Sequence, residues 1–268
     1  MKFQVDHDYH IHSRISLCSN DPEQNNERIL QYAKENGFSR ICLTDHHWQK
    51  NIPGVWGDFY WEQDLEHIQQ ALPLPQADGV EFLFGCETDM NCQMIVGVSK
   101  EEWDLFDFII VPTTHFHMEG FSLSKEDAKT TEGRARAWVN KLEALLEQDL
   151  PFHKLGVAHL ACSLIDGSSR EAYLSVLDAI PAEEMERLFL KAAQRGCGIE
   201  LNSSDMAFSD EEADRVLRMF RIAKQCGCKF YLGSDAHHPK ELDKAKAIFE
   251  RAVDLLELTE EDKFHIGK

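Results

Sequence analysis

The sequence predicts an α/β fold, namely a barrel of parallel strands linked by helices, in a single domain over residues 1–268. Apolar strand-like runs alternate with helical patterns from end to end, and no change of composition divides the chain. The strands are almost uninterrupted apolar runs, as at residues 108–111, which is typical of a sheet that helices cover. Seven such runs each end at a polar side chain, and in an α/β barrel the loops after the strands carry the chemistry.

Seven strands are predicted along the chain. In order they are residues 5–12, 40–46, 80–89, 106–115, 155–162, 198–203 and 229–235. The helical patterns between and after them are residues 24–36, 135–148, 183–195, 210–225 and 241–256. Gly37 ends the first helix, and apolar residues in the second recur at the 3.6-residue spacing of an amphipathic helix. The short apolar run 93–98 predicts a hairpin partner for the third strand.

Two connections are unusually long, at residues 48–79 and 117–133. Long connections in a compact domain are often functional. The first contains a group of aromatic residues: Trp48, Trp56, Phe59, Tyr60 and Trp61. These side chains either pack on the rim of the barrel or form a lid over the substrate.

The composition limits the partners of this chain. It has 47 acidic and 28 basic residues and a formal net charge of −19, which repels nucleic acid. Bound divalent cations would add roughly +2 each and attract a small anion locally. No apolar run approaches the about 20 residues that cross a bilayer. The first six residues enter a strand directly and show no signal-peptide core, so the expected location is cytoplasmic.

The eight cysteines do not predict a disulfide framework. Most lie inside apolar runs, where a free cysteine behaves as a small core residue. Cys226 and Cys228 are separated by one residue and therefore lack the two-residue spacer of common zinc and redox pairs.

The first and last strands each end in a pair of metal-binding side chains. Residues i and i+2 of a strand face the same side, so His10 and His12 both point inward and can share one cation. Asp235 and His237 repeat this spacing on the last strand. Because the first and last strands of a barrel are neighbours, the two pairs are expected to meet. The sequence therefore predicts a metal site.

The intervening strands end in further metal-binding or supporting groups. A carboxylate at Glu87, after an apolar run, is costly to bury unless it bridges two cations or pairs with an arginine. His115 and His159 each end an apolar strand at the same level of the barrel, which favours metal binding. The supporting residues expected around these ligands are Asp8, Asp45, Glu200 and Asn202.

These motifs together resemble the PHP (polymerase and histidinol phosphatase) family over the whole chain. The matching segments are His10-Ile-His12-Ser13, Leu43-Thr44-Asp45-His46, Gly85-Cys86-Glu87, His115, Ala158-His159, Glu200-Leu201-Asn202 and Ser234-Asp235-Ala236-His237. The resemblance implies a distorted (β/α)7 TIM-like barrel with up to three metals that hydrolyse phosphoesters. It assigns one metal to His10, His12, Glu87 and Asp235. A second would take His46 and His237, and a third would share Glu87 and add His115 and His159.

Cys18 departs from the family pattern, which often has a histidine at this position as a further ligand. A thiolate is a good ligand for zinc or iron, so Cys18 is either a ligand or a bystander beside a weakly held second metal. The resemblance implies two or three divalent ions, and the ligand set suits zinc, iron or manganese alike.

The expected reaction is in-line attack of a metal-bridged hydroxide on a small phosphate monoester, with Glu87, Asp235 and His237 as catalytic residues. In length the histidinol-phosphatase branch of the family is the nearest. Candidates for phosphate binding are Arg14, His117, His238 and Lys240, although Arg14 is equally well explained as solvated or ion-paired. Two alternatives stay open, an amidohydrolase and a metal-binding module without turnover. The amidohydrolase lacks a candidate for its usual carbamylated lysine.

Overall fold

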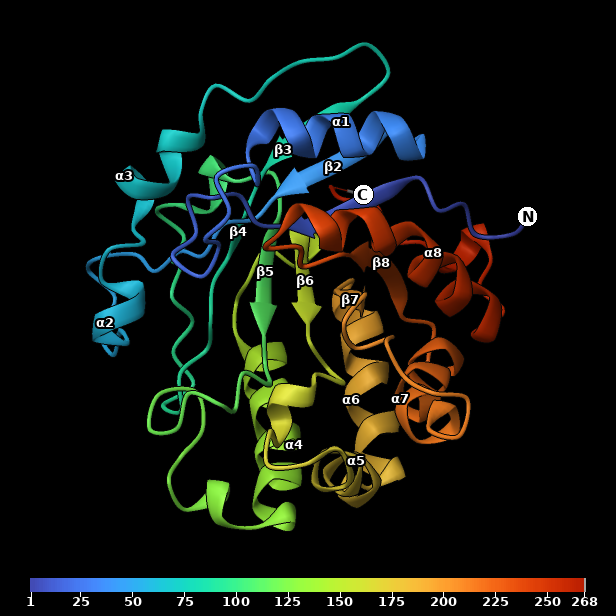
Figure 1. Ribbon diagram of the computed structural model, residues 1–268. Coiled ribbons are helices and arrows are strands. Elements are labelled where there is room, and N and C mark those ends of the chain that lie inside the picture. Colours follow the sequence, from blue (N-terminus) through green and yellow to red (C-terminus); the bar gives the residue numbers. More distant parts are fainter. Residues whose placement is uncertain (268) are drawn as a thin grey trace.

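The computed structural model describes residues 1–267, and its strands form a central barrel with the helices outside (Figure 1). The strands are β1 (His7–Ile11), β2 (Arg40–Leu43), β3 (Glu81–Phe84), β4 (Cys86–Glu87), β5 (Ile109–Pro112), β6 (Leu155–Ala158), β7 (Gly198–Asn202) and β8 (Lys229–Gly233). Every neighbouring pair is parallel, in the orders β1-β2-β3 and β4-β5-β6-β7-β8. Parallel pairing throughout is the arrangement that the apolar runs predicted.

Two junctions close these sheets into one barrel. Between β8 and β1, the Asp235 N–H donates to the His10 carbonyl at 2.7 Å, and the His12 N–H donates to the Ala236 carbonyl at 3.1 Å. Between β3 and β4 the chain is interrupted only at Gly85, where a Cβ atom would lie 2.4 Å from the Phe108 carbonyl oxygen. We therefore count β3 and β4 as one kinked strand. The predicted barrel of seven strands, distorted at this kink, is confirmed.

The helices are α1 (Asn26–Asn36), α2 (Gly57–Tyr60), α3 (Leu65–Ile68), α4 (Thr131–Glu147), α5 (Arg170–Ala179), α6 (Ala182–Arg195), α7 (Ala213–Gln225) and α8 (Pro239–Leu255). All five predicted helices are present. Helix α5 was not predicted, because its ten residues lie between the turn-forming Ser169 and the helix-breaking Pro181. The run 93–98 makes one antiparallel bridge, Met90 to Val96, instead of a hairpin strand.

Three hydrophobic clusters organise the interior. The largest lies between the strands and the surrounding helices and includes Ile109 and Val111. Phe108 and Ile110 alternate with these residues and belong to a second cluster, which therefore lies inside the barrel. The third cluster joins the two long connections, since Trp48 and Tyr60 from the first pack with Phe121 from the second. Among the described residues, no helix is long and apolar enough to cross a membrane.

Candidate metal centre

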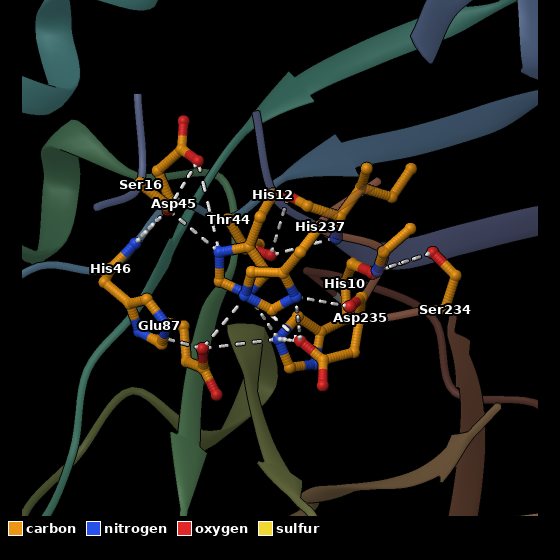
Figure 2. Close-up of polar contacts among 12 residues, drawn as sticks. His10, His12, Ser16, Thr44, Asp45, His46, Glu87, Ser234, Asp235 and His237 are labelled. Atoms are coloured by element: carbon orange, nitrogen blue, oxygen red, sulfur yellow. Dashed lines mark hydrogen bonds and ion pairs between the residues drawn. The ribbon is translucent and has the colours of Figure 1, made fainter. Parts of the chain in front are cut away.

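The first predicted ligand group converges at the carboxyl end of the barrel (Figure 2). The Nε2 atoms of His10 and His12 lie 3.1 Å apart. The same two atoms lie 3.4 and 3.2 Å from Oε2 of Glu87, and 3.3 and 3.2 Å from Oδ1 of Asp235. With ligand bonds of about 2.0–2.1 Å, tetrahedral coordination spaces its ligand atoms by about 3.3–3.4 Å. The four side chains therefore fit one divalent cation.

Glu87 has the geometry of a bridging ligand. Its side chain is fully buried, and neither carboxylate oxygen has a hydrogen-bond partner. Oε2 faces His10 and His12, whereas Oε1 lies 3.9 Å from Nε2 of His115 and 3.6 Å from Nε2 of His159. An unpartnered buried carboxylate is costly, and cations on both sides would remove that cost. This arrangement favours the predicted bridge over an ion pair with arginine.

The second ligand group contains His46 and His237, as the resemblance implied, together with His12. The ring of His12 stacks on that of His237 at 4.1 Å between centroids, and the His46 ring is 4.5 Å from His12. Nδ1 of His237 lies 2.8 Å from the backbone oxygen of Asp235, which leaves Nε2 for a metal. All three ligand atoms lie within 4.8 Å of one another.

The third group consists of Glu87, His115 and His159, as the resemblance implied. Asp235 also reaches this group, because its Oδ2 lies 3.4 Å from Nε2 of His159 while its Oδ1 faces the first group. His159 and Asp235 both have a positive φ, of 60° and 54°. Non-glycine residues rarely adopt this conformation, and such strain is concentrated at functional sites.

Buried carboxylates orient the histidines. Oε1 of Glu200 accepts a hydrogen bond from Nδ1 of His10 at 2.6 Å, and its Oε2 accepts one from the His159 N–H at 3.0 Å. Such contacts fix the ring so that Nε2 faces the cation. On the other side Asp45 accepts a hydrogen bond from Ser16, whose hydroxyl lies 3.0 Å from Nδ1 of His12. These contacts are the ones that the supporting roles expected for Glu200 and Asp45 require, and the roles themselves stay predictions.

Two further carboxylates beside the candidate ligands were not predicted from the sequence. Asp89 lies 3.2 Å from Nδ1 of His115 and also accepts a hydrogen bond from the Tyr60 hydroxyl. Its position two residues after Glu87, within the strand predicted for residues 80–89, is a signal that could have revealed it. Asp205 lies 3.9 Å from Nδ1 of His159 and accepts the Ala161 N–H. It belongs to the loop after β7, where no periodicity marks it.

The ligands strongly perturb one another in the absence of a cation. Burial disfavours the protonated ring of His10, but Glu200, Glu87 and Asp235 outweigh it and raise the pKa of His10 well above its usual value. Burial likewise disfavours the charged form of Glu87, but His46 and His10 outweigh it and hold the pKa of Glu87 well below its usual value. Protons on these rings occupy the same region as a metal would, so metal binding would release them.

A cavity of about 370 Å³ opens above these ligands. It is lined by Cys18, His46, Trp56, Phe59, Tyr60, Glu87, Asp89, His115, His117, Met118, Leu164, Asp235 and His237. Among the described residues that line it there is no lysine or arginine. Its size falls in the range of ligand-binding pockets, about 300–1,000 Å³.

Comparison with known proteins identifies the family. The profile of the PHP domain family matches residues 8–204, which is most of the chain. The chain belongs to the PHP domain family. A curated relative from Deinococcus radiodurans named "Probable histidinol-phosphatase" is 26% identical over 251 residues, which cover 88% of this chain and 87% of the relative.

Two solved structures share the fold. The histidinol phosphate phosphatase of Lactococcus lactis, complexed with zinc, L-histidinol and phosphate, has a TM-score of 0.58 at 19% identity, covering 92% of this chain and 93% of its own. A protein of Listeria monocytogenes assigned as the histidinol phosphatase hisK has a TM-score of 0.58 at 15% identity, covering 91% and 99%. The predicted family, the distorted barrel and the class of enzyme, a metal-dependent phosphoesterase, are confirmed.

The remaining predicted site residues of this PHP protein lie in different places. Cys18 borders the cavity, where burial and then Glu87 and Asp235 raise the pKa of its thiol, but it belongs to none of the ligand groups found among the described residues. Its role as a ligand stays a prediction. Of the proposed phosphate-binding residues, His117 lines the cavity.

The other three phosphate-binding candidates lie away from this cavity. Arg14 and Lys240 are exposed. Nε2 of His238 lies 2.9 Å from Asp21, and the His238 side chain caps the start of α8. These residues are close to the candidate ligands in the sequence but not in space. The chain leaves the rim of the barrel directly after His12 and after His237, so these side chains lie outside the cavity. No candidate lysine or arginine therefore lines the cavity in the described part of the chain.

Proposed function

We propose that this protein hydrolyses a small phosphate monoester at a cluster of two or three divalent cations, with histidinol phosphate as the first substrate to test. The observation that carries the proposal is the pair of unpartnered oxygens of buried Glu87, which face two groups of histidines. The relatives support the substrate, since they are named as histidinol phosphatases.

Bound divalent cations would supply water acidified toward a pKa of about 7 and would offset charge on the phosphate. The side chains of this protein would position these cations. Glu87 and Asp235 each direct their two oxygens to different ligand groups. His237 lies at the edge of the cavity with its Nδ1 bound to the backbone, so its ring orientation is fixed. These are the three residues that we assign to catalysis.

The metal that the enzyme uses belongs to the proposal. Six histidines and two carboxylates suit zinc, iron or manganese. Zinc is the ion present in the Lactococcus lactis structure, which favours it as the first ion to test. We propose that two or three positions are occupied among the three ligand groups described above.

The test is phosphate release by protein purified without chelator. Supplemented with Zn²⁺, Mn²⁺ or Fe²⁺, it should release phosphate from histidinol phosphate or another metabolite in a panel of monoesters. A chelator should abolish the activity, and the same ion should restore it. Metal content below one ion per chain, or no release from any ester, would refute the proposal. Hydrolysis of cyclic amides instead would favour an amidohydrolase, and full metal content without turnover would favour a binding module.

A further inference from the structure

The cavity has a second wall that the metal chemistry does not use. Four apolar side chains form it, Trp56 and Phe59 from the first long connection, Met118 from the second, and Leu164 after β6. We infer that this apolar wall binds the alcohol part of the substrate, and that it selects monoesters whose alcohol carries a planar ring and no second anionic group. The inference rests on the proposed phosphatase function and names its substrate class.

The apolar wall begins in contact with a metal ligand. The ring of Phe59 lies edge-on to that of His46, with 5.1 Å between centroids and an angle of 71°. Trp56 follows at 6.1 Å from Phe59. An ester whose phosphate is held by cations at these ligands would therefore share one cavity with these two rings. Aromatic side chains at such distances favour stacked or edge-on contact with another ring.

Trp56 of the apolar wall packs against a buried cluster of aromatic residues. The indole of Trp56 is parallel to the ring of Phe121, at 16° and 6.0 Å. Phe121 in turn packs on Trp48 and Tyr60, all three of which are buried. The Tyr60 hydroxyl donates to Asp89, beside the metal ligands. Because the first connection is fixed by these contacts, the wall is preorganised, which lowers the entropic cost of binding.

The charges around the cavity exclude a second anion. Apart from the histidines and Cys18, its ionisable lining residues are Tyr60 and the acids Glu87, Asp89 and Asp235, and no lysine or arginine lines it within residues 1–267. A carboxylate or second phosphate beyond reach of the cations would meet the apolar wall, Asp89 and the ring of His117, with no lysine or arginine beside it among the described residues. It would lose its hydration without gaining the charged partner that a lysine or arginine provides, which is unfavourable. A neutral or cationic ring has no such cost, and aromatic faces attract cations.

The experiment compares the KM values of matched substrates, and the KM values of enzymes with substitutions at two tryptophans of the same connection. Phenyl phosphate should be hydrolysed with a lower KM than both glycerol 3-phosphate and 4-carboxyphenyl phosphate. Trp56→Ala should raise the KM for phenyl phosphate roughly three- to tenfold, with little change in kcat and none in metal content, since ring contact of this kind is made equally before and during reaction. Trp56→Phe should retain most of the affinity. The control is Trp61→Ala, which removes an indole that is 65% exposed in the same connection and absent from the cavity lining.

The possible outcomes distinguish failure of the inference about the apolar wall from failure of the proposed phosphatase function. Equal KM values for Trp56→Ala and Trp61→Ala, or equal use of phenyl phosphate and 4-carboxyphenyl phosphate by an active enzyme, would overturn the inference alone. Absence of phosphate release from every ester would overturn the proposed function, and the inference with it. Loss of metal from Trp56→Ala would show that the indole supports the cluster rather than the substrate, and would also overturn it.

Discussion

Replacing Glu87 by glutamine should empty two metal positions rather than one. Glutamine has nearly the same shape but carries no charge, so packing is preserved while the bridge is lost. Oε2 of Glu87 lies 3.2 Å from His12 and Oε1 lies 3.6 Å from His159, which belong to different ligand groups. Removing one partner of a buried charge pair costs roughly 3–5 kcal/mol. Each position should therefore lose at least about a hundredfold in affinity.

The assay is elemental analysis of each variant after gel filtration without chelator, together with phosphate release. The matched control is Glu81→Gln, because Glu81 lies at the other end of the same kinked strand, is exposed and pairs with Arg40. The control should retain the metal content and activity of the wild type. If Glu87→Gln loses a single ion, Glu87 serves one position and the bridge is refuted. If it loses none, Glu87 is not a ligand.

Three further predictions concern other parts of the molecule. Cys18→Ser should lower metal content and activity together and Cys18→His should restore both, whereas a serine variant with full metal content would remove Cys18 from the ligands. Burial lowers the pKa of Lys141 from 10.5 to about 8, so the unfolded chain binds more protons between these values and stability should rise with pH there by up to about 3 kcal/mol. In denaturant titrations Lys141→Met should lack this rise, and its persistence would contradict the assignment. Finally, the net charge of −19 should prevent hydrolysis of oligonucleotides at physiological salt, which a nuclease assay measures.

Most of the metal ligands could be predicted because strand geometry constrains them. In a parallel strand, residues two apart face the same side, and in a closed barrel all carboxyl ends meet at one rim. His10 on β1, His12 directly after it and Asp235 after β8 follow from these two rules alone. The register shift between Asp8 and Ile11 includes His10, but Nε2 of His10 still lies 3.1 Å from Nε2 of His12.

The surroundings of the site could not be predicted to the same extent. The aromatic residues of the first long connection lie in different environments, and the lid interpretation stays a prediction. Trp48 is buried in the third cluster and Trp56 lines the cavity, whereas Trp61 is exposed. Nothing in the spacing of these residues distinguishes them, since the connection has no regular periodicity and its conformation depends on packing against Phe121. Arg14 was predicted to bind phosphate because it follows His12 closely in the sequence. A turn after His12 places it at the surface instead.

The strand ends and the long connections have different roles in the proposed recognition of the substrate. The strand ends carry candidate metal ligands such as Glu87 and His159, and the connections carry the apolar wall with Trp56 and Phe59. Since no lysine or arginine among the described residues lines the cavity, nothing in its lining other than bound cations can attract the phosphate strongly. Two or three divalent ions add roughly +4 to +6, which exceeds the charge of the lining carboxylates and makes the site locally positive in an acidic protein. In the proposed function, phosphate binding and phosphate hydrolysis would therefore depend on the same ions, whereas the choice of alcohol would depend on the connections.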